Sequence, residues 1–439
     1  MTTLRTTWPV ASFLGFVFLT NFAVGLYTLT VGKVLFDKTG SVLAFGYVLI
    51  AEHVLNLLLQ GFAGALVDRG RPLRLLVFAN LVRGLLTLSL AGLMLLRGEV
   101  STATALFVFM GFATCSPLFR SAYFVVPKML AAGDDLVAFH GKLSAIYQIG
   151  QLAGVGTAGL LLNWSSEAAV MTTAVVFVVS PLCLLVVARG ARSLASAASG
   201  NKSWWRELLA RGVWLARNRF SVIPLLLACS VDFLTVGIIN LVLVPLVARD
   251  YGGQSLFLAV FDGAFAVGAI GGGLLVSRFP RLKRPLLAGA GMLASSVLLL
   301  GLGQALGQLI HLAVFTGLGA VVSISGAVFS GEIQSRTPDH MAGTIAAFRF
   351  MLISVVSSAG IAAFSLLQQT SLMLAIQASA IAYVVFFVVV TLGGLAAQTH
   401  SWSRMRIPLI SATQSTERLP PVPGQSCHPS ERSDADRGL

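Results

Sequence analysis

Long apolar segments recur along most of the chain, and each is about as long as a helix that crosses a bilayer. Because a helix rises about 1.5 Å per residue, about 20 apolar residues cross ~30 Å of hydrocarbon. Charged and polar residues separate the segments. The sequence predicts twelve spans, at residues 8–33, 41–67, 73–96, 101–127, 139–163, 166–188, 220–247, 253–277, 285–307, 309–331, 342–367 and 370–398. The expected fold class is an all-α membrane protein with twelve transmembrane helices.

The composition excludes the other main classes of protein. Of the 439 residues, 56% are hydrophobic and 11% are charged, and the mean hydropathy is +0.86. A soluble domain carries about 25% charged residues, and a disordered chain needs low hydrophobicity. The composition therefore excludes a soluble enzyme and a disordered chain.

The cysteines and the short motifs give no sign of a metal, a cofactor or catalysis. The four cysteines are Cys115, Cys183, Cys229 and Cys427, and none belongs to a CxxC pattern or a Cys/His cluster. The chain also lacks a Walker A pattern, so it has no sequence support for ATP-driven transport. We expect no metal, no cofactor and no enzymatic activity.

The excess of basic residues follows the predicted topology. The chain has 30 Lys and Arg against 17 Asp and Glu, a formal net charge of +13. Most basic residues in the loops follow even-numbered spans, and the opposite loops hold only Lys38, Arg97 and Arg249. Cytoplasmic loops are rich in Lys and Arg, so we expect both termini in the cytoplasm and the protein in the inner (plasma) membrane. The charge thus predicts topology, and a nucleic-acid partner is not expected.

The predicted spans divide into two halves of six. The N-terminal half covers residues 1–188, and its first apolar run is longer than the apolar core of a typical signal peptide. Residues 189–219 place apolar side chains, among them Trp205 and Trp214, at helical spacing between arginines. This pattern predicts an amphipathic helix on the cytoplasmic leaflet. The C-terminal half covers residues 220–398, and the polar residues 399–439 are expected to be disordered.

Two loops in corresponding places of the halves have similar sequences. Residues 64–69 read GALVDR and residues 273–278 read GLLVSR, each at the end of the second span of its half. Corresponding loops in two six-span halves are typical of a transporter built from parallel repeats. An Asp beside several Arg can form charge-assisted hydrogen bonds to a neighbouring helix. We therefore expect a conformational latch in the first copy. Its residues are Gly64, Asp68, Arg69, Arg71 and Arg74, whereas Ser277 replaces the acid in the second copy.

These features resemble the major facilitator superfamily. Residues 64–74 look like the signature loop between helices 2 and 3 of that family. Residues 36–41, 117–130 and 205–219 are similar to its exporter branch that contains the enterobactin exporter and macrolide efflux pumps. The segment 150–159 resembles the glycine-rich antiporter motif of helix 5 through Gly150, Gly154, Gly156 and Gly159. The resemblance covers residues 8–398 and implies secondary transport of a small molecule.

Several ionisable residues are expected near the middle of the bilayer. Four of them lie at an estimated depth of roughly 14–18 Å from the start of their spans: Glu52, Arg83, Asp232 and Asp262. Inserting a charge at this depth costs at least ~2.5–3.5 kcal/mol of free energy. Polar residues accompany them in the same or neighbouring spans. These are Asn56, Asn80, Gln148, Gln151 and Asn240. We expect the set to line a cavity for protons or substrate, since burial favours the protonated form of a carboxyl group. A fixed ion pair between Glu52 and Arg83 is the alternative.

Together these patterns predict proton-antiport efflux of an amphipathic small molecule, such as a siderophore or a related natural product. Three alternatives stay open. The first is a multidrug or macrolide pump, and the second is an importer with the same fold. The third is a membrane receptor or scaffold that does not transport. The expected partners are a small-molecule substrate, protons and the lipid bilayer, and the chain is expected to act as a monomer.

Overall fold

The structure is a computed structural model, and it describes residues 8–39, 42–69, 72–97, 101–131, 134–190, 212–214, 219–252, 254–279, 285–304 and 307–405. The chain divides into two compact units, residues 1–395 and 396–439. Within the described ranges, every helix belongs to the first unit except the last residues of α14.

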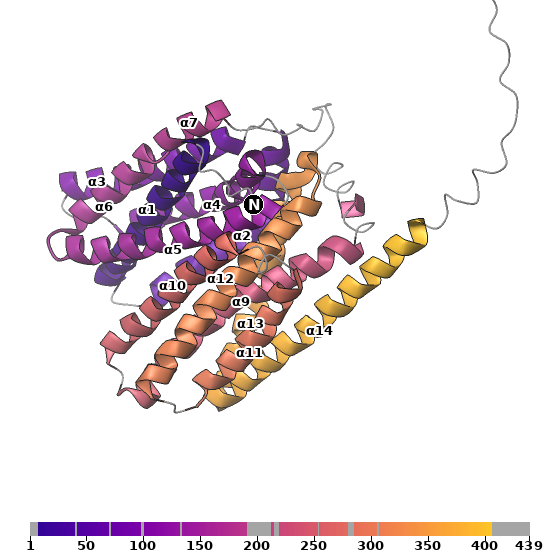
Figure 1. Ribbon diagram of the computed structural model, residues 1–439. Helices are drawn as coiled ribbons and strands as arrows, with labels where there is room; N and C mark the ends of the chain where they lie inside the picture. The colour runs from indigo at the N-terminus through magenta and orange to yellow at the C-terminus, as the bar shows by residue number, and fades with distance from the viewer. Residues whose placement is uncertain are drawn as a thin grey trace, which may run out of the picture. The chain divides into compact units, whose positions relative to one another are not determined.

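The described residues fold into helices and contain no strand (Figure 1). In the N-terminal half these are α1 (Trp8–Thr39), α2 (Val42–Arg69), α3 (Pro72–Arg97), α4 (Thr102–Leu130), α5 (Asp134–Leu162), α6 (Ser166–Val179) and α7 (Leu182–Gly190). In the C-terminal half they are α9 (Arg219–Asp250), α10 (Ser255–Arg278), α11 (Pro285–Leu302), α12 (Gln308–Arg336), the 3-10 turn η2 (Asp339–Met341), α13 (Ala342–Thr370) and α14 (Leu372–Met405).

The all-α membrane fold is confirmed. In the described part of the chain, eight helices are long and apolar enough to cross a membrane, and two shorter helical stretches are also apolar. Many large apolar side chains point outward, for example Leu95, Leu160 and Leu366. Such a surface suits lipid rather than water. With α6 and α7 taken as one interrupted span, the helices correspond to the twelve predicted elements.

Several predicted boundaries need correction, since α1 ends at Thr39, α5 begins at Asp134 and α12 ends at Arg336. The sixth span, expected as one helix over 166–188, is broken between α6 and α7 at Ser180 and Pro181. Proline has no N–H for the helix ladder and clashes with the preceding turn, which accounts for the break. The last helix, expected to end at 398, continues to Met405. The remainder of the expected tail, residues 406–439, lies outside the described residues.

The predicted amphipathic linker falls almost wholly outside the described residues. Within 189–219, the structure describes the end of α7, the helical residues 212–214 and the first residue of α9. The linker helix therefore stays a prediction.

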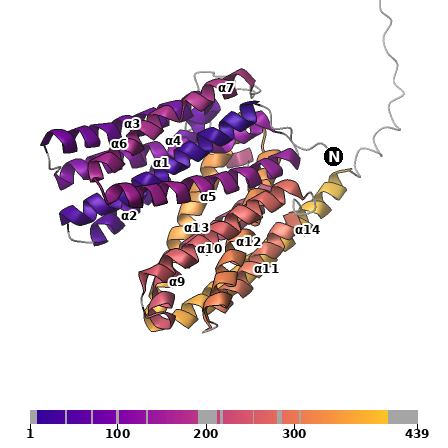
Figure 2. The ribbon, with the colours of Figure 1, turned by 60° about the vertical axis from the view of Figure 1, so that its left-hand side comes forward.

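The helices of each half pack mainly on one another. In the N-terminal half α1 lies along α5, α6 and α7, and α3 lies against α4 and α6. In the C-terminal half α12 packs on α9, α10 and α11. Figure 2 shows α1–α7 and α9–α14 as two groups.

Among the described helices, four pairs make the most extensive contacts between the two halves. The pairs are α2 with α13, α5 with α10, α5 with α12, and α4 with α13. The first two are equivalent under the repeat, because α2 and α10 carry the matching sequences GALVDR and GLLVSR. The two halves therefore meet through equivalent helices.

Candidate functional site

The Asp68 carboxylate, at the end of α2, binds the first turn of α13 in the other half. It accepts hydrogen bonds from the backbone N–H groups of Gly343 (2.6 Å) and Thr344 (2.9 Å), and from the Thr344 hydroxyl (2.6 Å). Asp68 is 7% exposed. The first N–H groups of a helix lack partners within that helix, and its positive dipole end favours an anion. Asp68 thus caps α13 from the opposite half, and its role as a conformational latch stays a prediction.

Glycines let the halves approach closely beside this cap. A Cβ on Gly64 of α2 would lie 2.6 Å from the Gly343 carbonyl oxygen, and a Cβ on Gly343 would lie 2.6 Å from the Gly64 carbonyl oxygen. The crossing of α5 and α10, which is equivalent under the repeat, has a similar close approach. A Cβ on Gly141 of α5 would lie 2.5 Å from the Gly273 carbonyl oxygen of α10. Any side chain at these positions would hold the halves apart.

Further polar contacts join the halves at the same end of the helices. Lys128 of α4 donates to the Thr337 carbonyl and pairs with Asp339 at 2.9 Å. Gln334 of α12 donates to the Phe124 carbonyl. The hydroxyls of Ser144 on α5 and Ser323 on α12 lie 2.7 Å apart. We call this region, from the Asp68 cap to the Ser144–Ser323 bond, the closed end.

The basic residues of the predicted latch lie at the end of α2 and the start of α3. Arg69 is the last residue of α2, and Arg74 is exposed in the first turn of α3. Arg71 lies outside the described residues. In the second copy, the Ser277 hydroxyl donates to Leu274 of its own helix at 2.7 Å. Among the described contacts, Asp68 of the first copy therefore binds a helix of the opposite half, whereas Ser277 of the second copy does not.

Asp232 is the buried carboxylate of the C-terminal half. It lies on α9, is 4% exposed, and has no hydrogen bond or ion pair with any other described residue. Its electrostatic partner is Arg349 of α13. A Cβ on Gly326 of α12 would lie 3.3 Å from its Oδ2 atom.

Arg349 connects Asp232 with the closed end, and the sequence reasoning missed it. Its guanidinium lies 4.9 Å from the ring centre of Phe124, which belongs to the N-terminal half, and 4.8 Å from that of Phe350. It also donates to the Cys229 sulfur (3.2 Å) and the Ser330 hydroxyl (3.3 Å). A basic residue inside the expected span 342–367 was the signal that could have identified it.

Arg83, the arginine predicted near the midplane of α3, packs inside the N-terminal half. Its guanidinium lies 4.6 Å from the ring centres of both Phe112 and Phe119, and it donates to the Ser116 hydroxyl at 3.0 Å. The side chain of Glu52 lies outside the described residues. The ion pair between Glu52 and Arg83 therefore stays a prediction.

The polar residues expected to line one cavity have different environments. Asn56 is 3% exposed, and its Oδ1 atom has no hydrogen-bond partner in the described part. Asn80 is fully buried and donates to Thr20 and Ser180 within its own half. Asp262 and Asn240 are exposed on the protein, and Gln148 and Gln151 are half-buried. The described contacts do not join these residues into one network.

The glycine motif of α5 packs on α1 through two of its four glycines. A Cβ on Gly150 would lie 2.7 Å from the Phe18 carbonyl oxygen, and a Cβ on Gly154 would clash with the Phe22 carbonyl oxygen. Gly156 and Gly159 have no atom within 4 Å of an added Cβ. The motif therefore holds α5 against α1 through Gly150 and Gly154, whereas Gly156 and Gly159 face open space.

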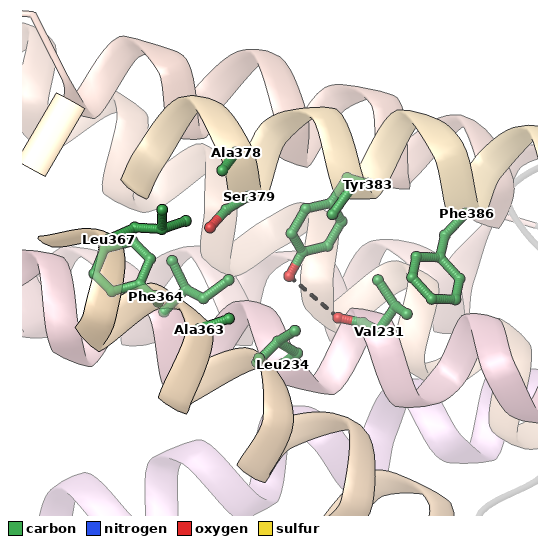
Figure 3. A pocket seen from close by; sticks show the side chains of 12 residues that line it. Val231, Leu234, Ala363, Phe364, Leu367, Ala378, Ser379, Tyr383 and Phe386 are labelled. Atoms are coloured by element: carbon green, nitrogen blue, oxygen red, sulfur yellow. Dashed lines mark hydrogen bonds between the residues drawn. The ribbon is translucent and has the colours of Figure 1, made fainter. Parts of the chain in front are cut away.

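A small apolar cavity lies among α9, α13 and α14 of the C-terminal half (Figure 3). Its volume is about 120 Å³, and helices α9, α13 and α14 form its walls. Phe364, Tyr383 and Phe386 supply its aromatic lining. The buried Tyr383 hydroxyl donates to the Val231 carbonyl (3.1 Å) and contacts the Thr235 hydroxyl (2.6 Å). The cavity offers room for about one ring, but few free polar groups.

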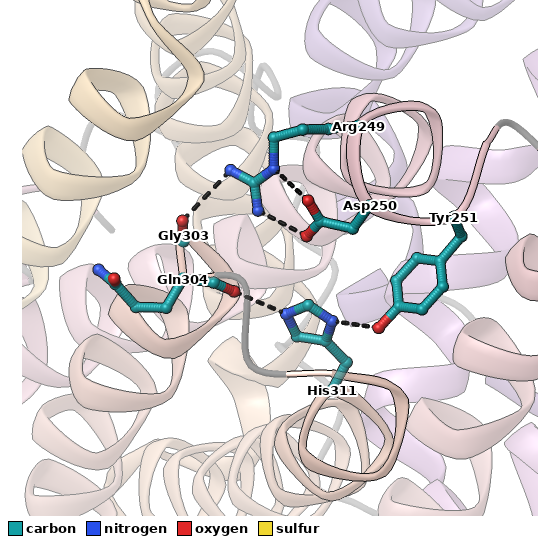
Figure 4. A network of polar contacts seen from close by, with 6 residues as sticks. All are labelled: Arg249, Asp250, Tyr251, Gly303, Gln304 and His311. Carbon is teal, nitrogen blue, oxygen red and sulfur yellow. Dashed lines mark hydrogen bonds and ion pairs between the residues drawn. The ribbon is translucent and has the colours of Figure 1, made fainter.

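A second polar network ties three segments of the C-terminal half together (Figure 4). The His311 ring is fully buried, with Nδ1 2.6 Å from the Tyr251 hydroxyl and Nε2 3.0 Å from the Gln304 carbonyl. Because a carbonyl only accepts, Nε2 carries the proton and Tyr251 donates to Nδ1. Arg249 binds Asp250 through two nitrogens and donates to the Gly303 carbonyl.

The described residues contain no group of three or more His, Cys, Asp or Glu that could hold a metal ion. The polar groups named above are carboxyl, guanidinium, imidazole, amide and hydroxyl groups. Such groups bind protons and charged or polar ligands.

The fold is that of known transporters. The structure superposes on the Escherichia coli fucose:proton symporter with a TM-score of 0.66 and 16% identity, covering 89% of this chain and 99% of that one. A bacterial homologue of the iron transporter ferroportin, in an outward-facing state, gives 0.64 and 16%, with 87% and 99% covered. The human organic anion transporter MFSD10 gives 0.72 and 14%, with 89% and 100% covered.

Sequence comparison points to one family. No curated protein sequence matches the chain, but the family model described as Major Facilitator Superfamily matches residues 11–361. That match covers most of both six-helix halves and includes Asp68, Asp232 and Arg349. The chain is therefore a membrane transport protein, and it belongs to the Major Facilitator Superfamily.

Proposed function

We propose that the chain exports an amphipathic small molecule across the plasma membrane in exchange for protons. The observation that carries the proposal is Asp232, a 4% exposed carboxylate that has no hydrogen bond or ion pair with any described residue and faces Arg349. A carboxyl group in this setting can alternate between a protonated and a charged form. Arg349 is the cation that stabilises the charged form.

Arg349 also gives a reason why proton binding at Asp232 would affect the halves. Its guanidinium stacks on Phe124 of the N-terminal half. Protonation of Asp232 removes the negative charge that holds Arg349 towards α9. The position of Arg349 against Phe124, and with it the closed end, then depends on the proton. Alternating access by two moving halves is the general mechanism of carriers with this architecture.

The export direction and the cargo rest on sequence resemblance. Gly150–Gly159 resembles an antiporter motif, and the branch that it resembles includes siderophore and macrolide exporters. The prevalence of phenylalanine, with 28 residues, suits an amphipathic or aromatic cargo. We further propose that the closed end and both termini face the cytoplasm, as the positions of the basic loops favour.

The direct test is cargo uptake into inverted membrane vesicles with an imposed pH gradient and a panel of siderophores and antibiotics. Proton antiport predicts uptake when the vesicle interior is acidic. Uptake driven by an acidic exterior would instead indicate symport, the activity named for the fucose relative. Absence of any gradient-driven movement across the panel would contradict the proposal.

The residue-level test compares two substitutions on α9. Asp232→Asn should abolish gradient-driven uptake at normal membrane abundance, because an amide cannot bind or release the proton. Ser230→Ala is the matched control, since the buried Ser230 hydroxyl bonds only to Leu226 of its own helix in the described structure. Unchanged transport in Asp232→Asn would exclude Asp232 as the coupling residue.

A further inference from the structure

The apolar cavity of the C-terminal half lies where one helix stands apart from its neighbours. Among the described helices, α14 is the long helix without an extensive backbone contact to another. Long side chains bridge the gap instead. Tyr383 of α14 donates to the Val231 carbonyl of α9, and Phe387 of α14 lies beside Gly289 of α11. The cavity is therefore the space that side chains leave unfilled between α14 and the packed pair of α9 and α13.

The chemistry of the lining suits an uncharged apolar molecule. No charged residue belongs to the described lining, and its two hydroxyl groups already have partners. Ser379 donates to the Ala375 carbonyl at 2.8 Å, while Tyr383 donates to Val231 and lies 2.6 Å from the Thr235 hydroxyl. A buried water needs two to four polar partners, and apolar cavities stay dry. A charged or strongly polar ligand would lose its hydration here without replacement.

The size and the aromatic lining of the cavity favour a single ring. Its volume of about 120 Å³ is close to the ~150 Å³ of an apolar protein cavity that binds benzene. Three aromatic side chains line it, Phe364 from α13 and Tyr383 and Phe386 from α14 (Figure 3). Aromatic rings attract one another in stacked and edge-on arrangements, beyond the gain from burying their area. A ring is therefore held better in this cavity than an aliphatic chain of equal volume.

The cavity reaches the surface of the protein between α13 and α14. Two of its lining residues, Ala363 of α13 and Ala382 of α14, are exposed. Beside them, Leu366 is 67% exposed and Ile381 is 63% exposed, and outward-facing large apolar side chains in a membrane protein suit lipid. The small side chains of the two alanines therefore form an entrance from the bilayer, in which apolar molecules accumulate because water excludes them.

We propose that this cavity is a binding site for a small, uncharged aromatic molecule that enters from the bilayer. The bound ring fills the gap between α14 and the pair of α9 and α13. The site is separate from Asp232 and Arg349, neither of which lines it. The segment of α9 that carries Asp232 also supplies the lining residues Val231 and Leu234, so a bound ring restrains that segment. The inference goes beyond the proposed export and does not depend on it.

The test measures binding of fluorobenzene, a probe of one ring, by fluorine NMR. The purified protein in lipid nanodiscs is titrated with fluorobenzene, and empty nanodiscs of the same lipid composition are titrated in parallel. Lipid dissolves the probe in proportion to its concentration, whereas a cavity becomes full. We expect a bound signal that saturates at one molecule of fluorobenzene per protein and is absent from the empty nanodiscs.

Matched substitutions on α13 locate the bound probe. Ala363→Leu places a larger side chain at the entrance and should weaken fluorobenzene binding by about tenfold or more, because a leucine occupies much of the space that a ring needs. Ala362→Leu adds the same atoms at the neighbouring exposed position, which is not part of the described lining, and should bind like the parent protein. Ala382→Leu closes the entrance from α14 and should repeat the loss. The titration of the parent protein decides if these variants do not fold.

Three results would overturn the inference. The first is the absence of a saturable signal in the parent protein, as expected if a lipid chain fills the cavity. The second is saturable binding that persists unchanged in folded Ala363→Leu and Ala382→Leu. The third is an equal loss in Ala362→Leu and Ala363→Leu, which would place the probe on the outer surface. The measurement uses neither cargo nor a pH gradient, so proton antiport through Asp232 can fail while this site holds, and the reverse is also true.

Discussion

The Asp68 carboxylate accepts a 2.6 Å hydrogen bond from the backbone N–H of Gly343, which lies in the other half of the chain. Asp68 also accepts two hydrogen bonds from Thr344. Its carboxylate therefore makes three of the hydrogen bonds that join the halves at the closed end. Hydrogen bonds to a charged group contribute about 1.5–3 kcal/mol each, and a helix cap contributes about 1 kcal/mol.

The first prediction concerns this cap. Asp68→Asn removes the charge, and its amide nitrogen cannot accept a hydrogen bond. We expect the closed arrangement to lose about 1–3 kcal/mol of free energy relative to the open one. Distance measurements between the halves should then show a smaller closed population. Ser277→Ala, at the equivalent place on α10, should have no such effect because the hydroxyl bonds to its own helix. An equal shift in both variants would contradict the asymmetry of the repeat.

The second prediction separates the glycines of α5. Gly154→Ala should lower the free energy of unfolding of the purified protein by about 1–3 kcal/mol, because its Cβ would meet the Phe22 carbonyl of α1. Thermal unfolding measures this change. Gly156→Ala meets open space and should be neutral or stabilising by up to ~1 kcal/mol, since alanine favours helix. Comparable losses in both variants would show that the tight contact with α1 is not what the motif provides.

The third prediction concerns Tyr383, which lines the apolar cavity of the C-terminal half. Because the Val231 carbonyl accepts from Tyr383, the Thr235 hydroxyl donates to the tyrosine oxygen. Tyr383→Phe should therefore cost about 1–3 kcal/mol of stability. Thr235→Val should cost less, and the double variant should fall short of the sum because the two residues share a bond. Strict additivity in thermal unfolding would exclude that shared bond.

The fourth prediction concerns pH and Tyr251. Burial and the neighbouring Asp250 carboxylate raise the pKa of Tyr251 above its ordinary value of 10.0. Its hydroxyl therefore stays protonated at neutral pH and continues to donate to His311. A raised pKa means that the stabilisation is present below the ordinary value and is lost as the pH rises through the raised one. The stability difference between the parent protein and Tyr251→Phe should be constant from about pH 7 to about pH 9 and shrink above about pH 10. Loss of the difference near neutral pH would contradict this role.

The fold was largely predictable because the apolar segments match the thickness of a bilayer. The lengths of the apolar segments set the number and order of the helices. The prediction from them was wrong only at individual boundaries. Pro181 interrupts one predicted span, and α14 continues beyond 398. These exceptions depend on backbone geometry at single residues, which a hydropathy pattern does not contain.

The site was less predictable because a sequence does not show which face of a helix meets which neighbour. The motif around Asp68 predicted a latch, but its partners lie about 275 residues away in sequence. Asn80 was expected to line a cavity, and instead bonds Thr20 and Ser180 inside its own half. Arg349 gains its meaning only through the packing of the two halves.

The glycine crossings determine how the closed end can come apart. Where Gly64 meets Gly343 and Gly141 meets Gly273, backbone lies close to backbone, and small side chains such as Ala347 pack beside it. Glycine at these points lets one half rotate against the other with few side chains in the way. The crossings can therefore act as paired pivots, and the activation barrier for opening is set by the few polar bonds around them. A substitution that weakens those bonds should change the rate of exchange between states as well as their populations.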